Sequence, residues 1–220
     1  ATKTLTPDRR RGNGWLKLQP LFENGKLVGW VNALGMPGPS FEEWLFDALV
    51  DGFYGRNVVV SLAVVEGLFW SRVAQIQAMC RDLESLLGNQ IAAVEINLSC
   101  PNTENGRLPS TEEAVAFCKI AKLSCSKSIP VIAKLSVAQD YVAIAKLLER
   151  EKLAEAISIN SVPWRMVFPD RVSPFAQYGG GGVSGQIAQP WTWEMVKQIA
   201  EETAIPVIGA SIWNEGDAEK

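Results

Sequence analysis

The chain has 220 residues, of which 47% are hydrophobic and 20% are charged, and its formal net charge is −3. This composition is typical of a globular protein and argues against a disordered chain or a broadly basic nucleic-acid-binding surface. The longest apolar stretch, residues 58–70, is shorter than the roughly 20 residues that a membrane-spanning helix needs. The length predicts one domain over residues 1–220.

The sequence contains no histidine. Acid–base chemistry near neutral pH must therefore use another side chain, and Ser-His-Asp triads, Cys-His dyads and histidine-dependent zinc sites are excluded. The four cysteines form no CxxC pair, so the spacing typical of zinc ribbons and iron–sulfur clusters is also absent. We therefore predict that the chain has no metal site.

The cysteines fall into two groups. Cys80, Cys118 and Cys125 lie on helical stripes of apolar residues, which predicts that they are buried in the core. Cys100 instead follows an apolar run and directly precedes Pro101, where neither a helix nor a strand continues easily. Reduced thiols without a pairing pattern favour a cytoplasmic protein.

Short β-branched runs alternate with longer helical patterns along the chain. Besides a strand ending at Lys3 and an accessory extended stretch, 27–34, the predicted strands are residues 58–64, 93–98, 131–135, 156–161 and 207–209. The predicted helices are residues 41–53, 72–87, 112–124, 139–152 and 192–203. Ser40 with Glu43, and Ser110 with Glu113, form capping boxes at two helix starts. Because the strands are continuous apolar runs, we expect a parallel sheet buried on both faces.

Polar residues follow four of these strands, in segments 97–100, 134–136, 160–161 and 209–211. Polar groups at the carboxyl ends of successive parallel strands are what the active site of a (β/α)8 TIM barrel requires, whereas the GxGxxG turn of a dinucleotide-binding sheet is absent. We therefore predict an α/β fold of the TIM-barrel class, with residues 163–178 as a long loop. Because fewer than eight strands are found, we expect a fragment that lacks the first and last strands of the barrel.

A cluster of side chains at the end of one predicted strand could carry chemistry. Asn97, Ser99, Cys100 and Asn102 stand there together, and Asn amides offer paired donors and acceptors for the edge of a planar amide or a pyrimidine ring. Cys100 is the candidate general base, because positive charge can bring a thiol pKa of about 8.5 closer to neutral pH. A polar turn in which Asn caps the next helix explains the same residues, and both interpretations stay open.

Lysine and glycine supply the other candidate groups. Lys134 ends an apolar strand, and burying an unpaired ammonium is costly, so we expect it to face an anionic or electron-rich partner inside the barrel. For Lys3, the sequence does not separate this role from that of a surface lysine. The glycine-rich stretches 179–185 and 209–211 could offer backbone N–H groups to a phosphate, or could be a flexible loop and a tight turn.

Together these segments resemble the dihydroorotate dehydrogenase family. The motifs run in family order across nearly the whole chain, and NLSCPN is the most specific of them. They are KT at 3–4, RGN at 11–13, NALGMP at 32–37, EINLSCPNT at 95–103, AKL at 133–135, INSV at 159–162, GGVSG at 181–185 and IG at 208–209. The resemblance implies an FMN-dependent barrel that oxidises dihydroorotate to orotate in pyrimidine (UMP) biosynthesis.

The resemblance also implies roles for single residues. Cys100 would remove the C5 proton of the substrate while hydride passes to flavin N5. The substrate would be bound by Lys3, Asn32, Asn97, Asn102, Asn160 and Ser161. The FMN would be bound by Lys3, Thr4, Asn97, Lys134, Gly182, Gly185, Gly209, Ala210 and Ser211, the last three in a turn that is one residue shorter than is usual in the family.

With a cysteine at the position of the base, Cys100, the sequence resembles the cytoplasmic class 1 enzymes of the family. These pass electrons to fumarate or, through a partner iron–sulfur flavoprotein, to NAD+, so we expect one of these acceptors and a homodimer or a heterotetramer, without a nucleic-acid or membrane partner. Dihydropyrimidine dehydrogenase is the nearest rival, but its motif typically has His where Asn102 stands, and its substrates lack the carboxylate that Lys3 would bind. A non-catalytic barrel subunit is the other alternative.

Overall fold

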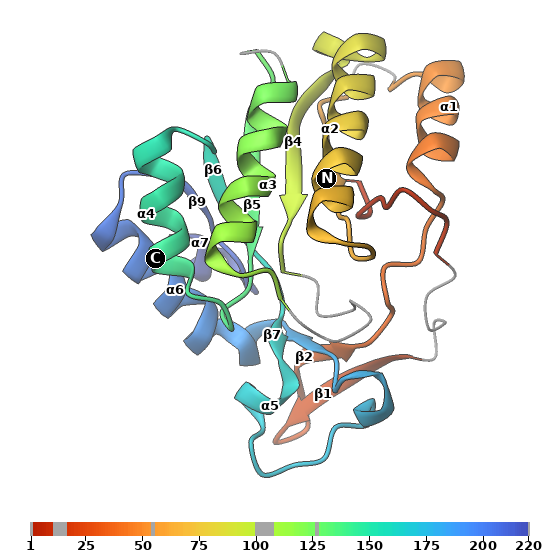
Figure 1. Cartoon of the computed structure of the whole chain (residues 1–220). Coiled ribbons are helices and arrows are strands. Elements are labelled where there is room, and N and C mark those ends of the chain that lie inside the picture. Colours follow the sequence, from red (N-terminus) through yellow and green to blue (C-terminus); the bar gives the residue numbers. More distant parts are fainter. Residues whose placement is uncertain (1, 11–16, 54–55, 100–107, 126–127, 220) are drawn as a thin grey trace.

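The structure is a computed structural model, and it describes residues 2–10, 17–53, 56–99, 108–125 and 128–219. These residues form an α/β fold with one parallel sheet, a smaller antiparallel sheet and a set of helices beside the parallel strands (Figure 1). The strand β4 points toward the small sheet, which therefore lies at the carboxyl ends of the parallel strands (Figure 1). None of the helices in the described ranges is long and apolar enough to cross a membrane.

The main sheet contains five parallel strands in the order β3-β4-β5-β6-β9. They are β3 (Val58–Leu62), β4 (Ile91–Asn97), β5 (Val131–Leu135), β6 (Ala156–Ile159) and β9 (Val207–Ile208). All five predicted strands are thus confirmed, with small differences at their ends. The amino-terminal segment lies parallel to β3 as well, because the Leu5 N–H donates to the Ser61 carbonyl at 2.7 Å. Among the described residues the sheet stays open beyond β9.

The five predicted helices are confirmed too. They are α1 (Phe41–Asp51), α2 (Phe69–Leu86), α3 (Thr111–Ser124), α4 (Tyr141–Glu151) and α6 (Gln189–Glu202). The helix α6 begins three residues before its predicted start, because Pro190 is accommodated in the first turn, where no intrahelical N–H bond is needed. Short helical turns follow at η2 (Gly88–Gln90), η4 (Gln186–Ala188) and α7 (Glu215–Ala218), the last capped by Asn214.

The helices pack on the sheet through one continuous apolar core. Cys80 and Cys118 are fully buried in it and Cys125 nearly so, which confirms the prediction that these three cysteines are core residues. Burial raises the pKa of the Cys118 thiol to about 12. A hydrogen bond with Cys125, together with burial, also holds the pKa of Cys80 above its ordinary range. Both groups therefore stay protonated at neutral pH.

Both predicted capping boxes are present, and one gives a stability prediction. The Ser110 hydroxyl accepts from the Glu113 N–H at 3.3 Å, and the Glu113 carboxylate accepts from the Ser110 N–H at 3.0 Å. We expect Ser110→Ala to lower the free energy of unfolding by about 1 kcal/mol, because the first turn of α3 loses one N–H acceptor. Urea unfolding measures the loss, with Ser85→Ala on the exposed side of α2 as the control. Equal stability of the two variants would contradict the prediction.

The small sheet was only partly predicted. Its antiparallel strands run in the order β1 (Leu18–Glu23), β2 (Lys26–Asn32), β8 (Gly182–Ser184) and β7 (Val162–Pro163). The accessory stretch 27–34 is confirmed as β2, but β1 was missed. Asn24 and Gly25 both have positive φ, of 48° and 76°, as a tight hairpin turn requires, so the Asn-Gly pair was the signal that would have revealed β1.

The prediction that residues 163–178 are a long loop is wrong. The segment contains α5 (Trp164–Val167) and the turn η3 (Ala176–Tyr178). Trp164 is buried in a second apolar cluster with Val31 and Val183, and its indole N–H donates to the Arg171 carbonyl at 2.8 Å. These contacts give the segment a core of its own, which a local sequence pattern does not reveal.

Candidate functional site

The parallel register gathers polar side chains on one face of the main sheet. Paired residues of neighbouring parallel strands point to the same face, and so do residues two apart along a strand. Ser61 pairs with Glu95, Asn97 pairs with Lys134, and Lys134 pairs with Ser158. Four strands, β3 to β6, therefore present these five side chains together toward their carboxyl ends.

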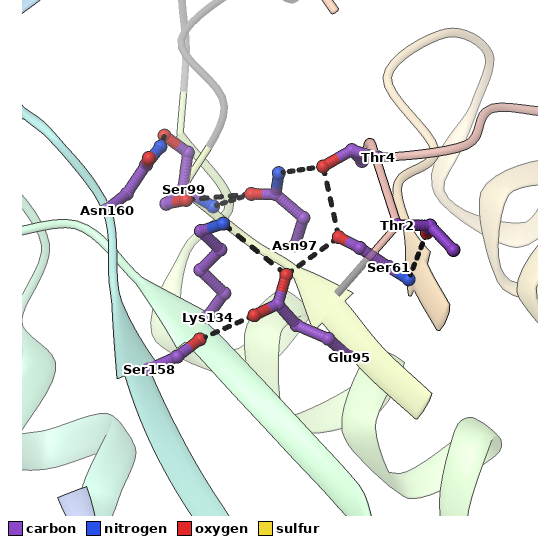
Figure 2. Close-up of polar contacts among 9 residues, drawn as sticks. All are labelled: Thr2, Thr4, Ser61, Glu95, Asn97, Ser99, Lys134, Ser158 and Asn160. Carbon is purple, nitrogen blue, oxygen red and sulfur yellow. Dashed lines mark hydrogen bonds and ion pairs between the residues drawn. The ribbon is translucent and has the colours of Figure 1, made fainter. Parts of the chain in front are cut away.

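Glu95 is at the centre of this group (Figure 2). Its side chain is buried, and one carboxylate oxygen accepts from the Ser61 hydroxyl at 2.7 Å while the other accepts from the Ser158 hydroxyl at 2.8 Å. The Lys134 ammonium lies 3.4 Å from the oxygen that Ser61 also contacts. Lys134 was expected to face an anionic or electron-rich partner, and within the protein the Glu95 carboxylate is such a partner. The sequence analysis did not identify Glu95 in this role.

Asn97 is held by its neighbours in one orientation. Its amide N–H donates to the Thr4 hydroxyl at 3.0 Å, and its carbonyl oxygen accepts from the hydroxyl and the N–H of Ser99 (Figure 2). The Thr4 hydroxyl also lies 3.0 Å from that of Ser61. A continuous chain of hydrogen bonds therefore joins Asn97 through Thr4 and Ser61 to Glu95.

A cavity of about 1000 Å³ opens where this group meets the small sheet. It brings together eight of the predicted site residues, which come from both sheets and from the amino-terminal segment: Lys3, Thr4, Asn32, Asn97, Lys134, Asn160, Ser161 and Gly182. Asn160 also donates to the Ser99 carbonyl at 3.4 Å, so the ends of β4 and β6 are tied together beside the cavity.

Four other predicted residues do not border this cavity: Gly185, Gly209, Ala210 and Ser211. The Ala210 carbonyl accepts from the Trp193 indole at 3.1 Å, and the Ser211 carbonyl accepts from the Gln189 amide at 3.0 Å. This turn is thus fixed against α6. Cys100 and Asn102 lie outside the described residues.

The cavity also has lining residues that were not among the predicted site residues. Ser136 directly follows β5, and Leu108 lies shortly before α3. Arg165, Arg171 and Tyr178 come from the segment that was predicted as a loop. Only the folding of that segment onto the small sheet brings them to the cavity, so no local pattern could have found them.

The family to which the chain belongs follows from comparison with known proteins. The sequence profile of the family described as dihydroorotate dehydrogenase matches residues 1–212. The chain belongs to the dihydroorotate dehydrogenase family. The resemblance inferred from the motifs is thereby confirmed over nearly the whole sequence.

Curated members of the dihydroorotate dehydrogenase family show how much of such a protein the chain represents. It is 27% identical over 209 residues to dihydroorotate dehydrogenase B (NAD(+)), catalytic subunit, of Listeria monocytogenes, covering 94% of this chain and 65% of that protein. It is 26% identical to dihydroorotate dehydrogenase A (fumarate) of Lactiplantibacillus plantarum, covering 83% of this chain and 59% of that protein. The chain therefore spans less than two thirds of the length of these relatives.

Solved structures show the same fold. The crystal structure of DHODH from Eimeria tenella in complex with ferulenol superimposes with a TM-score of 0.68 at 18% identity, covering 98% of this chain and 64% of that one. The ligand-free DHODH of the same organism gives a TM-score of 0.67, also at 18% identity, over 98% and 66% of the two chains. The predicted fold class is thus confirmed.

Proposed function

We propose that this chain carries the active site of an FMN-dependent enzyme that oxidises dihydroorotate to orotate in pyrimidine biosynthesis. The observation that supports this most directly is the cavity at the carboxyl ends of the parallel strands, which is lined by three asparagines and two lysines. In barrels of this class, active sites lie at that end of the sheet. Family membership over residues 1–212 supports the same reaction.

The residues that line the cavity fit an FMN. The cavity volume of about 1000 Å³ is at the upper end of the range for small-molecule sites. The half-buried Lys134 ammonium suits an electron-rich ring, and Thr4 and Asn97 offer hydrogen bonds to its edge. We propose that these three residues, with Lys3 and Gly182, hold the flavin ring and its ribityl chain. We further propose that the phosphate extends beyond this cavity to Gly185 and to the turn at Gly209, Ala210 and Ser211. Bound FMN would supply the hydride acceptor.

The substrate would lie against the ring and be oriented by amides. Asn32 on β2, Asn97 on β4 and Asn160 after β6 reach the cavity from three elements, so they can hold a planar pyrimidine from several edges. We propose that Asn102 and Ser161 complete this set, that Lys3 binds the substrate carboxylate, and that Cys100 accepts the proton. In a chain without histidine, a thiol is well suited to that base role near neutral pH.

An anaerobic titration with dihydroorotate tests the proposal. We expect the protein to bind FMN and the flavin absorption band to bleach as dihydroorotate is added, because hydride transfer reduces the flavin. The titration is run on this chain and on the full gene product. A yellow protein that bleaches with dihydrouracil and not with dihydroorotate would favour the dihydropyrimidine dehydrogenase alternative, and a protein that binds no flavin would favour the non-catalytic barrel.

The electron acceptor is a second part of the proposal. Relatives named for NAD(+) and for fumarate are both similar to this chain, so we propose one of these two routes, with NAD+ reached through an iron–sulfur flavoprotein partner. We further propose a homodimer or a heterotetramer in the cytoplasm. Mixing the reduced protein with fumarate distinguishes the routes, because direct reoxidation needs no partner.

A further inference from the structure

Glu95 is an unusual residue for its position. It stands in the middle of β4 between Val94 and Ile96, both of which are fully or almost fully buried. A carboxylate in such a place loses most of its hydration, so it is tolerated only when hydrogen bonds and an opposite charge replace the lost water. Ser61, Ser158 and Lys134 supply these from three different strands.

The Glu95 carboxylate is buried more deeply than the Lys134 ammonium with which it pairs. The Glu95 side chain is 7% exposed, whereas that of Lys134 is 24% exposed and lines the cavity. The carboxylate therefore lies behind the ammonium as seen from the cavity. No other carboxylate in the described part of the chain lies within ion-pair distance of Lys134, so Glu95 alone among these residues anchors its charge.

We propose that Glu95 is a positioning residue that holds the Lys134 ammonium at the cavity wall, with the hydroxyls of Ser61 and Ser158 fixing the two carboxylate oxygens. Two short hydrogen bonds prevent the carboxylate from rotating, so the direction of the lysine side chain is set from behind. The consequence for catalysis rests on the proposed function: a fixed ammonium would support the flavin ring.

The same hydrogen bonds extend the effect of Glu95 to a second site residue. Ser61 lies between Glu95 and Thr4, and Thr4 accepts from the Asn97 amide (Figure 2). Asn97 and Lys134, which flank each other in the register of β4 and β5, are therefore both oriented by one buried carboxylate. A purely structural ion pair would not need to connect with two cavity residues.

The first test uses the flavin-free chain and does not depend on catalysis. We expect Glu95→Gln to release the Lys134 side chain, so that its Cε and Nζ resonances, identified by their loss in Lys134→Met, move to the position and line width of exposed lysines. Glu155→Gln is the matched control, because Glu155 also pairs with a lysine, Lys122, and also contacts β5, at the Val131 N–H, but does not line the cavity. Lys134 resonances unchanged in Glu95→Gln would overturn the proposal.

A second variant covers the case in which Glu95→Gln does not fold. Ser158→Ala removes one hydrogen bond from the carboxylate and leaves both charges in place, so we expect a smaller change of the Lys134 resonances in the same direction. If this variant folds and the resonances do not move, the serine has no part in positioning the lysine, and the proposal fails.

The flavin-loaded protein gives the third readout. We expect Glu95→Gln to slow flavin reduction by dihydroorotate about 10-fold or more, similar to Lys134→Met, and the double variant to add no further loss. Additive losses would show that the two residues act independently and would overturn the proposal. If the unmodified protein does not bleach at all, the proposed function fails, while the resonances of the flavin-free chain still decide whether Glu95 positions Lys134.

Discussion

Replacing Cys100 with alanine is expected to slow flavin reduction by dihydroorotate about 100-fold or more and to leave FMN binding intact. A positioned general base typically contributes a factor of this size to a proton transfer. The chain has no histidine that could take over the role. The two fully buried core cysteines hold their protons at neutral pH, since the pKa of each thiol is raised. Neither can replace a lost base.

Stopped-flow measurement of the flavin band under anaerobic conditions gives the rate, and equilibrium dialysis gives the FMN affinity. Cys118→Ala is the matched control, because it removes a thiol from the core of α3 and leaves the cavity lining as it is. We expect its rate of flavin reduction to equal that of the unmodified protein. A Cys100→Ala protein that is reduced at that same rate would remove Cys100 from the base role.

The main sheet and its helices could be predicted because their signals are local. Apolar runs marked the parallel strands, β3 and β4 among them, and the capping boxes at Ser40 and Ser110 marked two helix starts. The position of Lys134 at a strand end likewise predicted that its ammonium faces an anionic or electron-rich partner. In each case the physical cause lies within a few residues of the feature that it determines.

The partner of Lys134 could not be predicted in the same way. Glu95 meets Ser61 and Ser158, which are 34 and 63 residues away in sequence, and only the register of β3 to β6 brings them together. A single acidic residue inside an apolar strand was nevertheless a usable signal, because burial of a carboxylate requires a partner.

For the predicted phosphate-binding turn, Gly209 to Ser211, the sequence has a local pattern but does not determine where the turn packs. Its glycine-containing pattern is visible in the sequence, but its placement against α6 depends on contacts of Trp193 and Gln189 that are specific to the folded chain.

Gly29→Ala is expected to lower the free energy of unfolding by about 2–3 kcal/mol and to weaken FMN binding. A Cβ atom at Gly29 would lie 2.2 Å from the Ser184 carbonyl oxygen and 2.9 Å from a methyl carbon of Ile187. The first of these is a backbone atom, which cannot rotate away as a side chain can. The strand β2 must therefore separate from β8, and overpacking of this kind costs up to about 3 kcal/mol.

Separation of the two strands also changes the cavity, because β2 and β8 both line it. Asn32 at the end of β2 donates to the carbonyl of Gly182 at the start of β8, at 3.5 Å, so separation of the strands moves both away from any bound ring. Urea unfolding and flavin titration measure the two effects, with Gly38→Ala as the control, because a Cβ at Gly38 meets nothing within 4 Å. If Gly29→Ala were as stable as Gly38→Ala, the close packing of β2 on β8 would be contradicted. If it lost stability but bound FMN unchanged, the small sheet would close the cavity without shaping the flavin site.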